Sequence, residues 1–216
     1  LNRYFPGSYE MTPSGVDPVE PAQESDGPLR IAFSDREEKG ALRLFLRGLR
    51  RLPADLDWTA TIFSDEPGEL DFRVSKTIRD RIKVIGPDQV SLAELLSVSH
   101  VYCATSTGPR PASAVLRQAM AAGAVPVAST IGRYTELVGD GQRGMLFPTG
   151  DPVTLAGQIN RLGNDPALLA KLKKAATGTD LVKDWDSIVD EIEGLYGRIA
   201  SRRHVIKRNP AIVKKL

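Results

Sequence analysis

The sequence lacks several features that define large classes of proteins. It holds one cysteine, Cys103, among 216 residues, so no disulfide can form within the chain. A single cysteine fits a reducing compartment. No apolar run approaches the roughly 20 residues that a membrane-spanning helix needs, and no secretory signal pattern opens the chain. We therefore expect a cytoplasmic protein, and we expect further chain to precede Leu1 in the parent protein.

An excess of one charge is also missing. The 29 Lys and Arg residues oppose 27 Asp and Glu residues, which leaves a net charge of +2. So small a charge gives no whole-chain field that would attract nucleic acid, and we predict no nucleic-acid partner. The one cysteine and two histidines form no cluster with metal-ligand spacing, so we predict no metal site.

What remains is the composition of an ordinary globular protein, with 41% hydrophobic and 26% charged residues. Residues 1–29 carry five prolines, three glycines and five acids against one arginine, which predicts a linker or interdomain segment. A short strand at residues 9–12 is possible within it. Residues 30–200 are predicted to form one domain, and residues 201–216 a basic C-terminal tail.

Short apolar runs alternate with helical patterns from residue 30 onward. This alternation predicts parallel βαβ units, and thus an α/β fold with a Rossmann-like, doubly wound parallel sheet. Such sheets bind ligands at the carboxyl ends of their strands, near the point where the strand order reverses. The expected strands cover residues 31–33, 58–63, 82–85, 101–103, 125–128 and 145–147.

Four helix boundaries carry local signals. Ser91 and Glu94 form a capping box, and Gly123 is suited to follow a helix C-terminus. Asp-Pro pairs at 151–152 and 165–166 each place an N-cap before a proline at the first helical position. Gly163 is the expected end of the helix that opens at Pro152. A last long helix is expected from Trp185, as its anchor in the core, to Ile199.

The loop after the fourth strand is the strongest candidate site. Residues 105–129 read as a strand end, a Gly/Pro/Ser loop and a helix, and free amides at a helix N-terminus suit a phosphate. Ser113 is the expected N-cap, with Arg110 just before it. The alternative is a plain βα connection whose small residues allow close packing, because every doubly wound sheet has such loops.

A second candidate is the charged segment from Ser34 to Gly40, which again joins a strand to a helix. Arg36 and Lys39 could both reach a diphosphate placed over the sheet. The alternative is a solvated, charged helix start, since acids in a first helical turn are favoured by the helix dipole.

Three landmarks follow one another in the second half of the chain: the run AMAAGAVPVAS at 119–129, Glu136-Leu137 and the segment GMLFP at 144–148. In this order they resemble the C-terminal domain of retaining GT-B glycosyltransferases of family 4 (glycosyl transferases group 1). The resemblance covers about residues 9–200 and implies half of a GT-B fold. Further landmarks in the same order are Asp151-Pro152, Lys39-Gly40 and Pro13–Asp17.

The resemblance also implies a donor site. In that family, a basic pair after the first strand and the loop–helix junction hold the diphosphate of a nucleotide-sugar. One helix glutamate holds the ribose, and a glutamate eight positions earlier lies near the transferred sugar. The register puts Gln118 at the ribose position and Arg110 at the earlier one, so neither glutamate is present. The family's glycines beside them are also replaced, one of them by Ser113.

The resemblance therefore predicts a glycosyltransferase domain that needs no cofactor and binds a nucleotide-diphospho-sugar as substrate. Arg36 and Lys39 would meet the diphosphate, joined by amides near Ser113, and the backbone at Gly86 would meet the base. The acceptor, a glycan or a lipid-linked molecule, would bind mostly to an N-terminal domain outside this sequence. The alternative is a degenerate, non-catalytic domain used for scaffolding or partner binding, which the lost glutamates favour.

The tail offers two interpretations. Residues 197–216 carry seven Lys or Arg and no acid. This composition suits peripheral contact with an anionic membrane at its inner face. It also suits a solvated end, or a segment that crosses to the absent N-terminal domain, and we favour this second interpretation.

Overall fold

The computed structural model describes residues 15–17, 27–38, 40–69 and 76–208, with backbone only at 201–208. The predicted strand at residues 9–12 and Lys39 lie outside these ranges. The chain divides into two compact units, one of Val16–Val182 and one that contains the residues from Lys183 onward. The predicted domain limits at residues 30 and 200 stay predictions.

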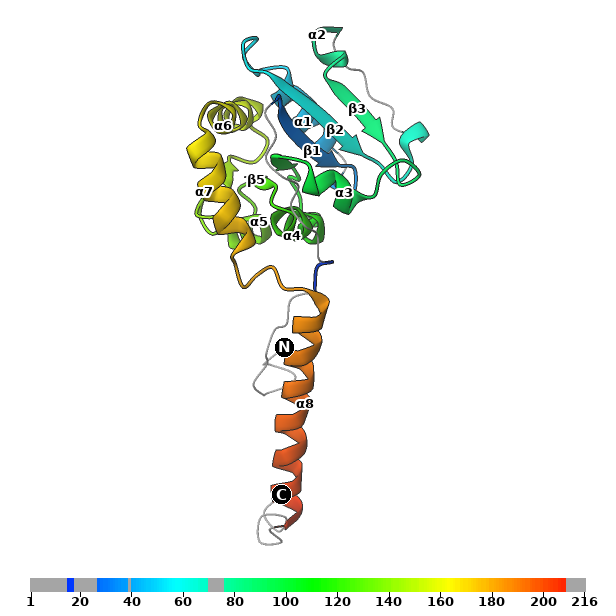
Figure 1. Ribbon diagram of the computed structural model, residues 1–216, viewed down its shortest axis with the longest axis vertical. Coiled ribbons are helices and arrows are strands. Elements are labelled where there is room, and N and C mark those ends of the chain that lie inside the picture. Colours follow the sequence, from blue (N-terminus) through cyan, green and yellow to red (C-terminus); the bar gives the residue numbers. More distant parts are fainter. Residues whose placement is uncertain (1–14, 18–26, 39, 70–75, 209–216) are drawn as a thin grey trace. The chain divides into compact units, whose positions relative to one another are not determined.

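A six-stranded sheet forms the centre of the first unit (Figure 1). Every pairing is parallel, and the strand order is β3-β2-β1-β4-β5-β6. A parallel sheet has both faces covered, which explains why its strands read as continuous apolar runs. The predicted α/β doubly wound sheet is confirmed. The strands are β1 (Leu29–Ser34), β2 (Trp58–Phe63), β3 (Ile82–Ile85), β4 (Val101–Ala104), β5 (Val125–Ser129) and β6 (Met145–Phe147).

Alternate strand residues enter two separate cores, because successive side chains of a strand point to opposite faces. In β4, Val101 and Cys103 belong to the core under α1 (Ala41–Leu49) and α6 (Pro152–Asn164). Tyr102 and Ala104 belong to the core under the helices of the other face. Those are α3 (Leu92–Ser97), α4 (Ser113–Ala121) and α5 (Gly132–Val138), while α7 (Pro166–Thr177) contributes to both cores. The 3-10 turn η1 (Pro67–Glu69) and α2 (Lys76–Arg79) lie between β2 and β3.

Most of the local helix signals are confirmed. Ser91 and Glu94 form the capping box of α3, and Asp151 and Asp165 cap α6 and α7 with proline in the first turn. The predicted end of α6 at Gly163 is wrong, because the helix continues through Asn164 to the Asp165 cap of the next helix. Helix α5 was not predicted.

Gly40 opens α1 in a conformation that glycine favours. Its φ is 100°, in the left-handed region, and it stands at the N-cap without any side-chain cap. From there α1 turns its apolar face inward, and Phe45 stacks on Phe33 of β1 with ring centroids 4.8 Å apart. Gly40 thus provides the turn by which the chain passes from the loop after β1 into α1, which packs on one face of the sheet.

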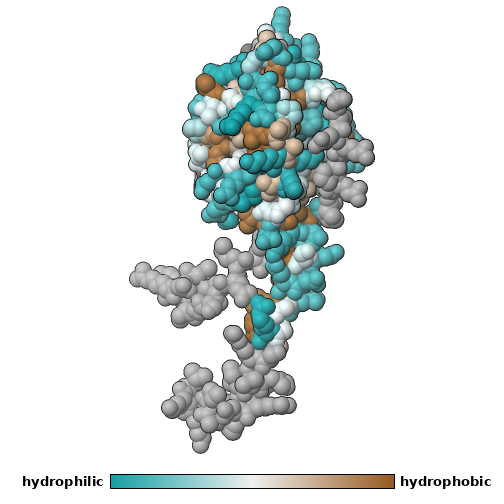
Figure 2. Space-filling model, turned by 60° about the vertical axis from the view of Figure 1, so that its left-hand side comes forward, coloured by the Kyte–Doolittle hydropathy of each residue, from teal (hydrophilic) through white to brown (hydrophobic). Residues whose placement is uncertain are grey.

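Helix α8 (Trp185–Arg208) belongs to the second unit and carries an exposed apolar stripe. Trp185 is 49% exposed, so it does not anchor the helix in a core as expected. Figure 2 shows hydrophobic and hydrophilic atoms together on this helix. The other large exposed apolar side chains of α8 are Val189, Ile192, Tyr196 and Ile199.

Replacing Gly40 with alanine is expected to lower the free energy of unfolding by about 1–2 kcal/mol, since a Cβ is disfavoured at positive φ. Among the described residues other than the chain neighbours of Gly40, no atom lies within 4 Å of the position where that Cβ would stand, so the cost is conformational rather than steric. Urea denaturation measures it.

Gly157→Ala is the matched control. Gly157 lies within α6, is exposed, and has open space at its Cβ position. Alanine there is expected to raise the free energy of unfolding by up to about 1 kcal/mol. Equal effects of the two substitutions would contradict the role given to Gly40.

Candidate functional site

The strand order places a reversal between β1 and β4. Strands β1, β2 and β3 follow one another outward on one side, and β4, β5 and β6 on the other. The connections that leave β1 and β4 therefore diverge to opposite faces, and the crevice between them is where open α/β sheets bind ligands. The two predicted loops, 34–40 and 105–112, both lie at this edge because they follow the carboxyl ends of β1 and β4.

A buried carboxylate joins these two loops. Glu37 is only 6% exposed, and hydroxyl groups surround it. Tyr134 donates to its two oxygens at 2.8 and 2.6 Å, and Tyr102 donates to Oε1 at 3.1 Å. Ser106 donates as well. The interpretation of residues 34–40 as a solvated helix start is therefore wrong for Glu37, and α1 has no acid in its first turn.

Burial governs the ionisation of this group. Removal from water raises the pKa of the Glu37 carboxyl, while the hydrogen bonds from Ser106, Tyr134 and Tyr102 act in the opposite direction without cancelling the effect. Burial, followed by the charge of Glu37, also raises the pKa values of the Tyr102 and Tyr134 hydroxyls. Both hydroxyls therefore remain protonated donors.

The neighbouring Glu38 faces the loop after β4. Its carboxylate accepts a hydrogen bond from the backbone N–H of Arg110. Its own N–H donates to Ser106 Oγ at 3.2 Å. Gly108 makes this approach possible, because a Cβ there would overlap the carboxylate and lie 3.0 Å from its Cδ. The backbone amide of Arg110, in the loop just before the predicted phosphate site, thus already donates to an acid of the chain itself.

The start of α4 differs from the prediction. Ala112, and not Ser113, is the N-cap, and no side chain caps the helix. Ser113 is the first helical residue, and its N–H donates to Pro111 O at 2.8 Å. The prediction that Ser113 is the N-cap is wrong because the Pro111 turn brings the chain into the helix one residue earlier.

Arg36 is paired within the protein. Its Nε and Nη2 donate to the two carboxylate oxygens of Asp65 at 2.8 and 2.7 Å, and its guanidinium lies 5.6 Å from the ring centre of Phe63. Hydrogen bonding to Arg36 lowers the pKa of Asp65. Both side chains are about half exposed, so the pair contributes little to stability. A diphosphate would compete with Asp65 for Arg36.

The other predicted donor residues lie at separate places in the fold. Gly86 is buried just after β3, and its carbonyl accepts the N–H groups of Gln89 and Val90. Arg110 is exposed in the loop before α4, and Gln118 is half-buried on that helix. Lys39 lies outside the described residues, so its position stays a prediction.

Further positive charge gathers where α4 and α5 meet. Burial, and then the charge of Arg133, lowers the pKa of Arg117. In the described part of the chain, its Nε is buried without a hydrogen-bond partner.

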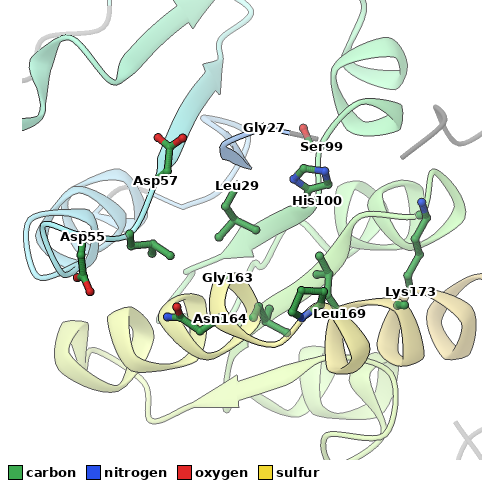
Figure 3. A pocket seen from close by; sticks show the side chains of 15 residues that line it. Gly27, Leu29, Asp55, Asp57, Ser99, His100, Gly163, Asn164, Leu169 and Lys173 are labelled. Carbon is green, nitrogen blue, oxygen red and sulfur yellow. The ribbon is translucent and has the colours of Figure 1, made fainter. Parts of the chain in front are cut away.

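One cavity among the described residues lies at the opposite end of the sheet. It has a volume of about 520 Å³. Leu29, Asp57 and His100 line it, and they stand at the start of β1, just before β2 and just before β4 (Figure 3). None of the predicted donor residues that the structure describes is among its lining residues. A cavity by itself is thus a poor guide to the ligand site here, because the fold places the candidate chemistry at the carboxyl ends of the strands.

The described residues contain neither a metal-binding cluster nor a membrane-spanning helix. Among the described residues, no three His, Cys, Asp or Glu side chains converge as a metal site would require. The prediction of a metal-free site stays a prediction. None of the described helices combines the length and apolar character needed to cross a bilayer.

A Rossmann-like unit with a loop–helix junction at its switch point defines a class of nucleotide-binding domains. The family described as "Glycosyl transferases group 1" matches residues 30–165. The chain belongs to this family, as the resemblance predicted.

Two curated relatives give the likeness in sequence. A phosphatidyl-myo-inositol mannosyltransferase of Mycobacterium leprae is 30% identical over 125 residues, 56% of this chain and 33% of the relative. A D-inositol 3-phosphate glycosyltransferase of Acidothermus cellulolyticus is 38% identical over 90 residues, 41% of this chain and 20% of the relative. The chain thus spans a third or less of the length of these relatives.

Solved structures show the same fold. HepE of Anabaena in complex with UDP-glucose superposes with a TM-score of 0.66 at 23% identity, over 79% of this chain and 49% of that one. The C-terminal domain of LpcC, a group 1 family protein of Francisella tularensis, gives 0.59 at 19% identity, over 77% of this chain and 96% of that domain. The latter match agrees with the predicted C-terminal half of a GT-B fold.

Sequence reasoning missed the residues that organise this edge. Glu37 stood in a charged run typical of a solvated surface, and Tyr102 stood in a strand where only apolar packing was expected. Tyr134 lies 97 residues from Glu37 along the chain. The one available signal was Ser106, a hydroxyl two residues after the end of β4 in a candidate loop.

The buried carboxylate makes stability depend on pH. Because the pKa of Glu37 is higher folded than unfolded, the folded state binds more protons above about pH 4.5, and the free energy of unfolding falls as the pH rises. Glu37→Gln removes this titration. Its difference in stability from the wild type, measured by urea denaturation between pH 4.5 and 8, is expected to shrink as the pH rises. A constant or growing difference would contradict the assignment.

Proposed function

We propose that this chain is the donor-binding half of a retaining GT-B glycosyltransferase, which takes a nucleotide-diphospho-sugar at the carboxyl edge between β1 and β4. The observation that carries the proposal is the α4 N-terminus, which has no side-chain cap and follows the loop at the switch point. Helix N-termini in this position favour phosphate. Membership in the glycosyltransferase family supports the choice of a sugar nucleotide.

The diphosphate is assigned to the basic groups of this edge. Lys39 and Arg36 follow β1, and Arg110 precedes α4. Arg36 is available once the ligand replaces Asp65, since that pair is half exposed and weakly held. Amides near Ser113 would complete the set.

The nucleoside is assigned to the two remaining predicted residues. Gln118 faces the ribose, where its carbonyl accepts a hydroxyl hydrogen bond without the help of a charge, and the backbone near Gly86 meets the base. A neutral hydrogen bond nets about 0.5–1.5 kcal/mol, against about 1.5–3 for a charged one. The donor is therefore expected to bind more weakly than in relatives that keep the glutamate.

The chemistry assigned to this half is electrostatic. Transfer of the sugar leaves a nucleoside diphosphate, whose growing negative charge is stabilised by positioned cations and amides. The acceptor, a glycan or a lipid-linked molecule, binds to a domain outside this sequence, so the 216-residue chain alone is expected not to turn over. Its basic end, seven Lys and Arg in residues 197–216, suits an anionic surface that carries such an acceptor.

A second function is favoured by specific observations. Arg110 and Gln118 stand where the family places its glutamates, Arg36 is paired with Asp65, and Glu38 covers the loop amide of Arg110. A domain that has lost donor binding and serves as a scaffold would show the same features.

Calorimetric titration with UDP and GDP separates the two functions. Saturable binding is expected for the donor-binding half. Lys39→Ala is expected to weaken it at least tenfold, because a charge-assisted phosphate contact is worth about 1.5–3 kcal/mol.

The control is Lys173→Ala, which removes the same charge beside the cavity at the amino ends of the strands. The affinity of the Lys173→Ala variant for UDP and GDP should equal that of the wild type. If Lys173→Ala loses binding while Lys39→Ala keeps it, the nucleotide binds at the amino ends of the strands, which contradicts the proposed donor site. Absence of binding at millimolar nucleotide would favour the scaffold.

A further inference from the structure

The carboxylate of Glu38 lies where an anionic ligand would meet the loop after β4. It accepts the backbone N–H of Arg110, and it fills the space that Gly108 leaves open by having no side chain. Glu38 is half-buried, so the residue is not sealed from solvent. A loop amide held in this way cannot donate to a phosphate at the same time.

The placement of Glu38 follows from its neighbour. Glu37 is tied to Tyr102, Ser106 and Tyr134, which fixes the backbone beside it. The N–H of Glu38 is held in turn by Ser106 Oγ at 3.2 Å. Two anchors on consecutive residues therefore hold the segment against the loop, and only the side chain of Glu38 beyond Cα is left to move.

Carboxylate and phosphate are alike in the features that the loop recognises. Both present negatively charged oxygens to a backbone N–H, and such charge-assisted bonds are the stronger kind. If both were present, they would repel each other across a few ångströms at a half-buried site, where screening is incomplete. A diphosphate and the Glu38 carboxylate therefore exclude each other on this loop.

We propose that Glu38 is an internal competitor for the donor diphosphate, and that its carboxylate must leave the Arg110 amide before a donor can bind. The proposal rests on the donor-binding function above and makes Glu38 a determinant of affinity. It also gives another explanation for the contact that favoured a scaffold. Glu38 covers the Arg110 amide because it blocks the donor site, and the donor site itself is retained.

The test is calorimetric titration of the 216-residue chain with UDP and, separately, with inorganic pyrophosphate. Glu38→Gln keeps the shape of the side chain and removes its charge. The hydrogen bond from the Arg110 amide to residue 38 then becomes neutral and weaker, so it competes less with a ligand. The affinity for both UDP and pyrophosphate is expected to rise about tenfold. Equal gains for the two ligands locate the competition at the phosphates. A gain for UDP alone would overturn it, since a contact with sugar or base would then be responsible.

Glu136→Gln is the charge-matched control. Glu136 is an exposed carboxylate on α5, and its substitution changes the net charge by the same amount. Its affinities are expected to stay within twofold of the wild type. If Glu136→Gln tightens binding as much as Glu38→Gln does, the effect is one of general charge and the proposal fails.

The amide proton of Arg110 gives a readout that needs no ligand. A hydrogen bond to a carboxylate shifts it downfield in the NMR spectrum, and Glu38→Gln is expected to move it upfield. An unmoved resonance would show that the contact is absent and would overturn the proposal.

The remaining outcomes separate the competitor role from donor binding. If the wild type binds UDP and Glu38→Gln binds it no tighter, the competitor role is overturned while donor binding stands. If Glu38→Gln binds and the wild type does not, both are supported. If neither protein binds UDP or pyrophosphate, donor binding fails and the competitor role fails with it.

Discussion

A carboxylate inside a protein needs hydrogen-bond donors around it, and three segments that are remote in sequence provide them for Glu37. Tyr102 comes from β4, Ser106 from the loop after it, and Tyr134 from α5. Since Glu37 itself follows β1, these bonds link the strands on the two sides of the reversal in strand order. Glu37 thus connects the two loops that border the crevice. The position of Glu38, and of the loop after β4 that Glu38 contacts, depends on these bonds of Glu37.

Charged and polar groups at this edge satisfy one another. Arg36 is paired with Asp65, and the Glu38 carboxylate accepts a hydrogen bond from the Arg110 amide. A protein that binds a diphosphate must break some of these contacts, and those at the surface are weak enough to break. Those around Glu37 are buried and are not. The edge therefore combines a rigid base with an exposed layer that can be exchanged for a ligand.

Much of the fold could be predicted because its signals are local. The capping box at Ser91 and the Asp-Pro pair at residues 151–152 act within one helical turn, and both are found where expected. The strands were recognisable because parallel strands are apolar on both faces. Errors arose where a neighbouring element decided the outcome, as at Gly163, where the next helix cap and not the glycine ends α6. At Ser113, the turn at Pro111 shifted the cap by one residue.

The sequence by itself determined the class of fold and the family, because periodicity, caps and motif order depend on near neighbours. It also predicted the edge of the sheet where a ligand would bind, and that edge stays a prediction. It could identify Arg36 and Arg110 as charges beside that edge, but it could not assign their partners. Only the tertiary structure decided that Glu37 is buried, that Asp65 forms an ion pair with Arg36 and that Glu38 accepts the backbone N–H of the loop. The reason is distance along the chain: Glu37 and Tyr134 are 97 residues apart, and only the packing of α5 on the sheet brings them together.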